Sequence, residues 1–401
     1  MEQNCKALAL RLQGLVVFRG LLKEPLIAQL RKLLDVGVYE QNDRCLVSAW
    51  GRFASELFAI SPNWTETLLE LVLQNENSCL TQSCKPAGAP EVLRQCMESE
   101  LQFLSALGQY TGADLLERIG EEGAFLPRWQ VSPADFSAAY ARRLADVWHT
   151  GYGVFARYRA FTVEDGLLVP VKHPDRQRLS DLPGYERERE KVLANTRALL
   201  AGQPAANVLL YGDAGTGKSS TVKAIANEYA AQGLRLVEVK KNQLYQIPEL
   251  MDTLAENPLK FILFIDDLSF TANDDNFAAL KAILEGSVGG RAHNIAVYAT
   301  SNRRHLIKET MSDREGDDIH HADTMQELMS LSARFGLTIT FSRPDKDRFV
   351  AIVMELAAQN GVGLPPEELT RKAEAFAIRS GGRSPRAARQ FVELLRAGVP
   401  L

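Results

Sequence analysis

The chain contains no continuous apolar run of about 18 residues, the length that a membrane-spanning helix requires. Near the amino terminus, charges at Lys6, Arg11 and Arg19 interrupt the apolar residues, so we expect no signal peptide there. Both absences argue against a membrane partner. We therefore expect a cytoplasmic protein.

Cysteine is scarce, and its distribution is uneven. The five cysteines all lie in the first hundred residues, and they are Cys5, Cys45, Cys79, Cys84 and Cys96. Their number is odd and no C-x₂-C pair occurs, so the sequence supports neither a disulfide framework nor a zinc site. Reduced thiols in a cytoplasmic protein are the default expectation.

An excess of positive charge is also missing. The formal net charge is -4 and the sequence pI is near 6.0, which argues against a generally basic surface for nucleic acid. A hydrophobic fraction of 46% and a charged fraction of 24% are typical of a globular protein. The length of 401 residues suggests two or three domains.

The most informative stretch runs from Ala205 to Val222 and contains the pattern G-x-x-x-x-G-K-S. An apolar run precedes this pattern and a helical pattern follows it, as in a phosphate-binding loop. Glycines there let backbone N–H groups close around phosphate oxygens. We expect Lys218 to reach the β- and γ-phosphates of ATP, and Ser219 to bind Mg²⁺ at the positive end of a helix. The predicted nucleotide contacts are Gly212, Asp213, Ala214, Gly215, Thr216, Gly217, Lys218, Ser219 and Ser220.

Polar side chains end the next two buried strands of the expected parallel sheet. A continuous apolar run ends in Asp266 and Asp267, and the following run ends in Asn302. We expect Asp266 to hold Mg²⁺ together with Ser219, in the position of a Walker B acid. Asp267 would polarise the attacking water. Paired acids at a strand end are rarely structural, because buried carboxylates need a cation or donors. Asn302 would bond that water or the γ-phosphate.

A single arginine, Arg334, lies where a predicted helix ends and the last strand begins. An arginine offered there to a neighbouring subunit's γ-phosphate would stabilise charge in the transition state. The alternative is an arginine that pairs with the carbonyl groups at the end of its own helix. Arg303 and Arg304 compete for the same role.

The last helix begins with a cation. Ser384 is a predicted N-cap and Pro385 a first helical residue, which places Arg386 in the first turn. Because the helix dipole does not favour a cation there, we expect an anionic partner for Arg386. A phosphate of ATP would serve.

The hydrophobic periodicity predicts three domains. Residues 1–165 form a mostly helical module of unknown role, with all four tryptophans expected in its core. Residues 166–343 alternate strands with helices in an α/β core, including a strand at Leu167–Val171 and a helix at Met325–Ala333. Residues 344–401 form a helical lid.

These motifs, in this order, resemble those of the AAA+ ATPase superfamily, from about Leu179 to the carboxyl terminus. The resemblance implies a three-layer parallel sheet with a helical lid, and it makes Asn302 sensor 1, Arg334 the arginine finger and Arg386 sensor 2. It also implies adenine-side contacts at Asp181, Leu182 and Gly184. The segments LLYGDAGTGKSSTVKA, FILFIDDLSF, YATSNRRHL and LSARFGL look like a bacterial family known as domain of unknown function 815. That family typically has an acidic residue where this chain has Ala333.

Three functions are consistent with the motifs. The first is an oligomeric Mg-ATP hydrolase that remodels a protein recruited by the amino-terminal helices. The second is a loader or initiator-like ATPase on single-stranded DNA, suggested by the arginine-rich turn from Asn302 to His305 and by the basic C-terminal helix with Arg383, Arg386, Arg389 and Arg396. The third is a nucleotide-gated switch that hydrolyses ATP slowly. We favour the first function. In it, copies of this chain form a homo-oligomer and act on an unknown protein partner.

Overall fold

The computed structural model describes residues 5–85, 87–268, 276–285, 292–302 and 334–400. The chain divides into two compact units, Met1–Arg157 and Tyr158–Leu401. The predicted helix at Met325–Ala333 lies outside the described residues, as do Arg303 and Arg304. Each unit is described below by itself.

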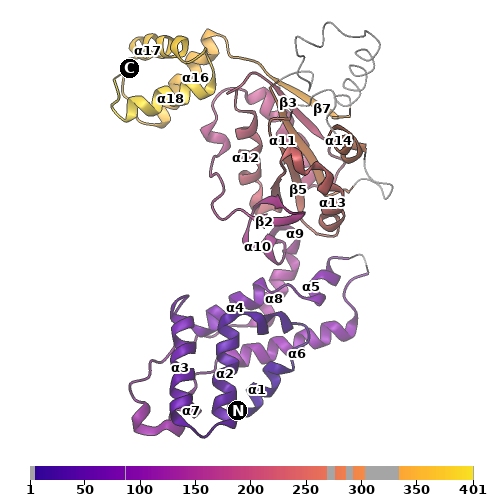
Figure 1. The fold of residues 1–401 in the computed structure, drawn as a ribbon, viewed down its shortest axis with the longest axis vertical. Helices are drawn as coiled ribbons and strands as arrows, with labels where there is room; N and C mark the ends of the chain where they lie inside the picture. The colour runs from indigo at the N-terminus through magenta and orange to yellow at the C-terminus, as the bar shows by residue number, and fades with distance from the viewer. Residues whose placement is uncertain (1–4, 86, 269–275, 286–291, 303–333, 401) are drawn as a thin grey trace. The chain divides into compact units, whose positions relative to one another are not determined.

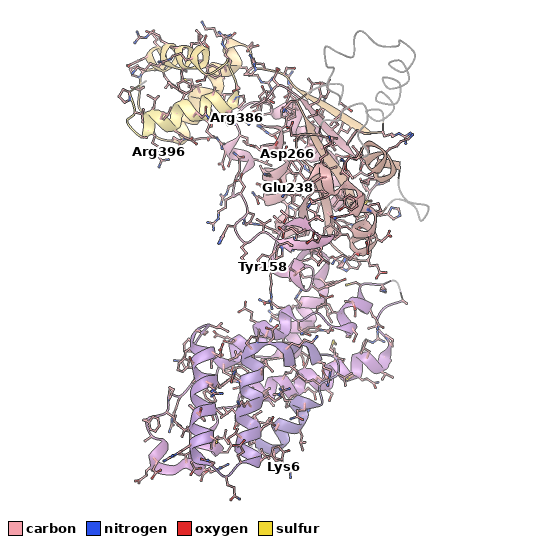
Figure 2. All side chains as sticks on the ribbon, in the orientation of Figure 1. Lys6, Tyr158, Glu238, Asp266, Arg386 and Arg396 are labelled. Carbon is pink, nitrogen blue, oxygen red and sulfur yellow. The ribbon has the colours of Figure 1, made fainter. Side chains whose placement is uncertain are left out.

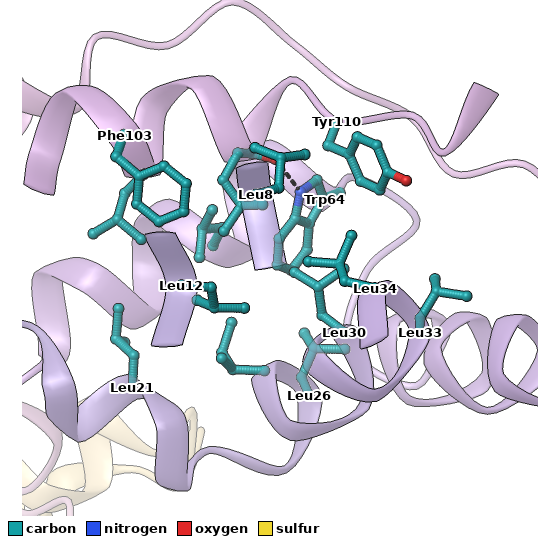
Figure 3. Packing of buried hydrophobic residues seen from close by; sticks show 14 of the residues in the cluster. Leu8, Leu12, Leu21, Leu26, Leu30, Leu33, Leu34, Trp64, Phe103 and Tyr110 are labelled. Carbon is teal, nitrogen blue, oxygen red and sulfur yellow. Dashed lines mark hydrogen bonds between the residues drawn. The ribbon is translucent and has the colours of Figure 1, made fainter. Parts of the chain in front are cut away.

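The first unit is built from helices packed around one apolar core (Figure 1). Its α-helices are α1 (Cys5–Gln13), α2 (Pro25–Tyr39), α3 (Asp43–Phe58), α4 (Trp64–Gln74), α5 (Ser78–Ser83), α6 (Glu91–Gly108), α7 (Ala113–Ile119), α8 (Phe136–Ala145), α9 (Val147–Thr150) and α10 (Val154–Arg157). Figure 3 shows leucines from α1 and α2 packed near Trp64, whose indole N–H donates to the Leu107 carbonyl at 2.8 Å. The predicted helical character of this region is therefore confirmed.

The tryptophans of this unit do not all behave as expected. Trp50, Trp64 and Trp129 are buried, and the rings of Trp50 and Trp129 are 4.5 Å apart. Trp148 is 52% exposed, so its predicted core position is wrong. Its helix, α9, has only four residues and ends at Thr150 before the C-cap Gly151. It is too short to present a continuous apolar face.

The second unit contains a twisted sheet. Within the described residues, seven strands pair in the order β2-β1-β4-β5-β6-β3-β7. They are β1 (Ala160–Glu164), β2 (Leu167–Pro170), β3 (Val208–Gly212), β4 (Leu234–Glu238), β5 (Lys260–Ile265), β6 (Ile295–Ser301) and β7 (Leu337–Phe341). All pairs are parallel except β1 with β2. The central strands β3, β5 and β6 are apolar and almost fully buried, as a sheet covered on both faces requires.

Helices cover both faces of this sheet, which gives three layers. Their bounds are α11 (Glu186–Leu200), α12 (Lys218–Glu228), α13 (Ile247–Ala255) and α14 (Asn276–Glu285). Helix α12 lies on one side of the sheet, and α13 and α14 lie on the other (Figure 1). The sequence did not predict β1, which is five residues long and pairs with β4 through only three residues.

The chain ends in three helices that we call the C-terminal bundle: α16 (Lys346–Gln359), α17 (Pro366–Arg379) and α18 (Pro385–Arg396). Tyr185 fastens this bundle to the sheet. Its ring stacks on Phe341 of β7 and carries the Arg348 guanidinium 3.9 Å above its centre. Arg348 also pairs with Glu188 of α11 at 3.0 Å. Bundle and sheet residues consequently share one apolar cluster.

The predicted fold class is confirmed: a three-layer parallel α/β sheet, helices after it and a mostly helical region before it. The predicted boundary at 165/166 coincides with the turn between β1 and β2. That boundary and the one at 343/344 stay predictions. None of the helices described by the structure has the length and apolar character needed to span a bilayer.

Candidate functional site

The predicted site residues follow strands that end at one edge of the sheet. Because β3, β5, β6 and β7 run parallel, their carboxyl ends lie side by side. The register pairs Tyr211 with Ser301 and Gly212 with Phe341. The loop after β3 therefore lies beside the residues that follow β5 and β6. This is the edge where ligands bind in open α/β sheets.

The loop after β3 passes very close to β7. Gly212 has φ of 137°, and a Cβ atom there would collide with the backbone of Phe341. Both facts require glycine at this position. The next residue, Asp213, accepts a 2.8 Å hydrogen bond from the Arg343 N–H and so ties the loop to the segment after β7.

Lys218 begins α12, and its side chain returns over the loop. The ammonium donates to the carbonyls of Gly212 and Asp213, at 2.9 and 2.8 Å, and to Asn302 Oδ1 at 3.1 Å. Burial lowers the pKa of Lys218, while the carboxylates of Asp213 and Asp266 act in the opposite direction. The loop thus holds a desolvated cation that an anion would stabilise further.

The two acids after β5 share a network with β6. Ser219 Oγ lies 2.6 Å from Asp266 Oδ1, and Thr300 Oγ donates to the same oxygen at 2.5 Å. The Thr300 hydroxyl accepts from the Asp267 N–H at 2.9 Å. Asp267 has a left-handed φ of 52°, and its carboxylate accepts from Asn302 Nδ2 at 2.8 Å. The structure therefore brings together Ser219, Asp266, Asp267 and Asn302, which the sequence predicted around the metal and the attacking water.

Arg386 approaches the same loop from α18 (Figure 2). The predicted N-cap is confirmed, since Ser384 Oγ accepts from the Ala387 N–H at 3.1 Å. The Arg386 N–H donates to the Gly215 carbonyl at 3.1 Å. A Cβ atom at Gly215 would lie 3.2 Å from Arg386 Cβ, so only glycine permits this approach comfortably. Across the ranges that the structure describes, the Arg386 guanidinium has no hydrogen-bond or ion-pair partner.

These groups surround one cavity of about 430 Å³, within the range of about 300–1,000 Å³ typical of small-molecule sites. Its polar wall consists of Asp181, Arg189, Ala214, Gly215, Thr216, Gly217, Lys218, Ser219, Ser220, Asp266, Asp267, Thr300, Asn302, Arg386 and Arg389. Its apolar wall consists of Leu182, Pro183, Tyr185, Ile352, Leu356 and Pro385. Cations, acids and an apolar face therefore meet in one space.

Some predicted residues lie outside the cavity wall. Gly212 and Asp213 instead hold the loop in place, through their carbonyl bonds to Lys218 and through the bond from the Arg343 N–H to Asp213. Gly184 has φ of 77° and packs against Ile352 of α16, where a Cβ atom would lie 2.8 Å from Ile352 Cδ1. The absence of a side chain at Gly184 therefore lets α16 of the C-terminal bundle approach, and does not serve ligand binding.

Arg334 lies at the opposite edge of the sheet. It lies three residues before Leu337, the first residue of β7, which pairs with Val208 at the start of β3. The five residues of β7 span roughly 16 Å at about 3.3 Å each. Arg334 therefore cannot reach the loop after β3 in its own chain.

A divalent cation fits the donor set at Ser219 and Asp266. Mg²⁺ prefers oxygen ligands and keeps several waters, so one carboxylate and one hydroxyl are sufficient protein ligands. The close approach of these two side chains allows both to bind one ion. In the portion of the chain that the structure covers, no group of three or more His, Cys, Asp or Glu residues forms another metal site.

Several cavity residues were not predicted from the sequence. Thr300 lies two residues before Asn302 at the end of a buried strand, and a polar side chain in that position is a usable signal. Arg389 lies one turn after Arg386, so helical spacing could have found it. Ile352 and Leu356 have no such signal, because apolar residues at this spacing are usual in any packed helix.

Residues 155–399 match the family described as Protein of unknown function (DUF815), and this match covers more than half of the chain. The chain belongs to this family. The DUF815 match contains every predicted site residue.

Solved structures similar to this DUF815 protein include the Thermotoga maritima RuvB Holliday junction branch migration motor, with TM-score 0.38 and 18% identity. That match covers 55% of this chain and 64% of the motor chain, which is less than two thirds of its length. Two single-residue variants of the same motor match with TM-score 0.38, at 18% and 17% identity. They cover 55% of this chain and 64% and 65% of theirs.

We predict that Thr300→Val destabilises the protein by about 1–3 kcal/mol, the usual cost of leaving a buried polar group unpaired. Thr300 is 2% exposed, and valine keeps its shape but removes the hydroxyl between Asp266 and the Asp267 N–H. Urea unfolding measures the difference, and Thr300→Ser is the control that keeps the hydroxyl. Equal stability of the valine variant and the wild type would contradict this role.

Proposed function

We propose that this protein binds Mg-ATP in the cavity at the carboxyl edge of the sheet and hydrolyses it. One observation carries this proposal: a glycine loop with a desolvated lysine, a Ser–Asp pair and an Asp–Asn pair line one space of nucleotide size. Phosphoryl transfer needs positioning and charge stabilisation more than covalent help from the protein. This donor set supplies both.

Each polar residue would act on a different part of the triphosphate. Lys218 would exchange its contacts to loop carbonyls for phosphate oxygens, and the N–H groups at the start of α12 would bind the same anion. Ser219 and Asp266 would hold Mg²⁺, which neutralises phosphate charge when bound. Asp267, oriented by Asn302, would accept a proton from the attacking water. Arg386 would face the terminal phosphate.

The apolar wall would accept the nucleobase. Leu182 and Pro183 come from the loop before α11, and Ile352 and Leu356 come from α16. A base between these two segments would contact the core and the bundle at once. We therefore include Asp181 and Leu182 among the adenine-side contacts, with Gly184 as the residue that lets α16 approach.

The position of Arg334 favours an assembly of several copies. This residue lies at the edge of the sheet remote from its own phosphate loop, as shown above. An arginine in that position can act on a neighbour's terminal phosphate and stabilise transition-state charge. We propose a homo-oligomer that remodels a protein partner recruited by the first unit, in the cytoplasm.

Contacts in the C-terminal bundle argue against a surface for single-stranded DNA. Arg383 forms an ion pair with Glu374 at 2.6 Å. Arg386 and Arg389 line the cavity rather than the outer surface. Arg383, Arg386 and Arg389 therefore have other roles, and the ATPase proposal is preferred. Arg303 and Arg304, which also suggested DNA binding, lie outside the described residues.

Steady-state ATP turnover tests the proposed activity. We expect Lys218→Ala to abolish turnover, because the loop loses its cation. We expect Asp267→Asn to keep ATP binding and lower turnover by about a hundredfold or more, the usual contribution of a general base. The matched control is Asp252→Asn, an exposed acid on α13. Wild-type turnover by Asp267→Asn would overturn the assignment of the base.

Subunit mixing tests the assignment of Arg334. Turnover per chain should rise with protein concentration, and Arg334→Ala should lower it about a thousandfold, as for other arginine fingers. Mixing inactive Arg334→Ala with inactive Lys218→Ala should restore activity, because each chain supplies what the other lacks. Arg371→Ala, an exposed arginine on α17, is the control. Absence of activity in the mixture would contradict action across a subunit boundary.

A further inference from the structure

Gln177 is a buried amide in the loop between β2 and α11, and it is 9% exposed. The backbone around it is fixed to α12, because Asn227 Nδ2 donates to the carbonyls of Asp175 and Gln177 at 2.8 and 2.9 Å. Its backbone is therefore held in place by the core of the second unit, independently of the C-terminal bundle.

The Gln177 side chain connects two helices of the cavity. The Gln177 amide is assigned with its nitrogen toward α12, because in the opposite orientation its oxygen faces only acceptors and its nitrogen only donors. In the assigned orientation it donates to Ser220 Oγ at 2.9 Å, in the first turn of that helix. Its oxygen then accepts from both terminal nitrogens of the Arg389 guanidinium on α18, at 2.5 and 2.6 Å. Ser220 directly follows Ser219, the proposed Mg²⁺ ligand. A single amide thus joins the phosphate-binding helix to the C-terminal bundle.

Arg389 is held by neutral oxygens. Besides Gln177, its guanidinium donates to the Asp181 carbonyl at 2.9 Å, on the adenine side of the cavity. Among the described residues, no carboxylate forms an ion pair with it. Hydrogen bonds from a charged donor are stronger than neutral ones, so this bridge is a substantial link for the bundle.

The spacing of Arg389 and Arg386 couples this bridge to the phosphates. The two arginines are three residues apart on α18, so they lie on neighbouring positions of one helix face. Any shift of α18 that breaks the Arg389 contacts also moves Arg386 and its hydrogen bond to Gly215. The position of Arg386 over the loop therefore depends on the bridge.

We infer that Gln177 and Arg389 are positioning residues that hold α18 against α12 and thereby set where Arg386 meets the terminal phosphate of ATP. The part of this inference that concerns ATP rests on the proposed function. The bridge itself does not, because it forms within the polypeptide. The two parts can therefore be tested separately.

Hydrogen–deuterium exchange of the full chain without nucleotide tests the bridge. Peptides that cover the start of α18 report the Arg386 N–H, which bonds to Gly215. We expect Gln177→Ala and Arg389→Ala each to speed exchange there about tenfold, the effect of losing one charged hydrogen bond. Gln177→Glu should keep wild-type protection, because its carboxylate still accepts from Arg389. Wild-type protection in both alanine variants would overturn the bridge.

Equilibrium binding of ADP and of a non-hydrolysable ATP analogue tests the positioning role. We expect Gln177→Ala, a change outside the cavity wall, to weaken binding of the analogue about tenfold and to leave ADP binding about as tight as in the wild type, because Arg386 is directed to the terminal phosphate. For the analogue, the double variant Gln177→Ala/Arg389→Ala should be no weaker than Arg389→Ala alone, since both changes break the same link. Gln177→Glu should bind both the analogue and ADP as tightly as the wild type does.

The control for both measurements is Arg396→Ala, on the same helix, whose partner Asn360 lies within the bundle. Equal losses for ADP and the analogue would show a merely structural role and overturn the positioning inference. If the wild type binds neither nucleotide, the proposed function and the positioning role both fail. The exchange measurement still decides whether the bridge exists.

Discussion

The parallel register of β3 between β6 and β7 is the constraint on which the rest of this structure depends. It places the ends of four parallel strands at one edge, and so puts a glycine loop, two acids and an asparagine within hydrogen-bond distance. Gly212 is the position that least tolerates another residue, because the loop must leave β3 against the backbone of Phe341. Everything that the site does chemically follows from this edge, since strand ends are held more rigidly than free loops.

The C-terminal bundle adds a second, softer set of contacts around the same cavity. Tyr185 and Arg348 fasten α16 near the apolar wall, whereas Gln177 and Arg389 fasten α18 near the phosphate loop. The first set rests on aromatic packing and the second on hydrogen bonds to neutral oxygens. Hydrogen bonds at a cavity wall can exchange with water when a helix moves, and buried stacking cannot.

Short-range patterns in the sequence were sufficient for the strand–loop–helix at Gly212–Ser219 and for the acids after β5, because each is a contiguous signal. Predicting that Asn302 and Asp267 lie together also required the order of strands, which the alternation of elements and the resemblance supplied. Gln177 could not be predicted, since its partners are 43 and 212 residues away by number and none marks it locally. Strand β1 was not predicted, and the role of Arg334 stays a prediction.

A structure of the full chain with Mg²⁺ and a non-hydrolysable ATP analogue tests the central claim most directly. We expect the triphosphate to bind to the N–H groups of residues 214–220, and the metal to bind to Ser219 and Asp266. The base should lie between Leu182 and Ile352. Lys218 should have left the carbonyls of Gly212 and Asp213 for the phosphates. A nucleotide bound elsewhere, or a cavity that stays empty at saturating analogue while Lys218 keeps its present contacts, would contradict the account.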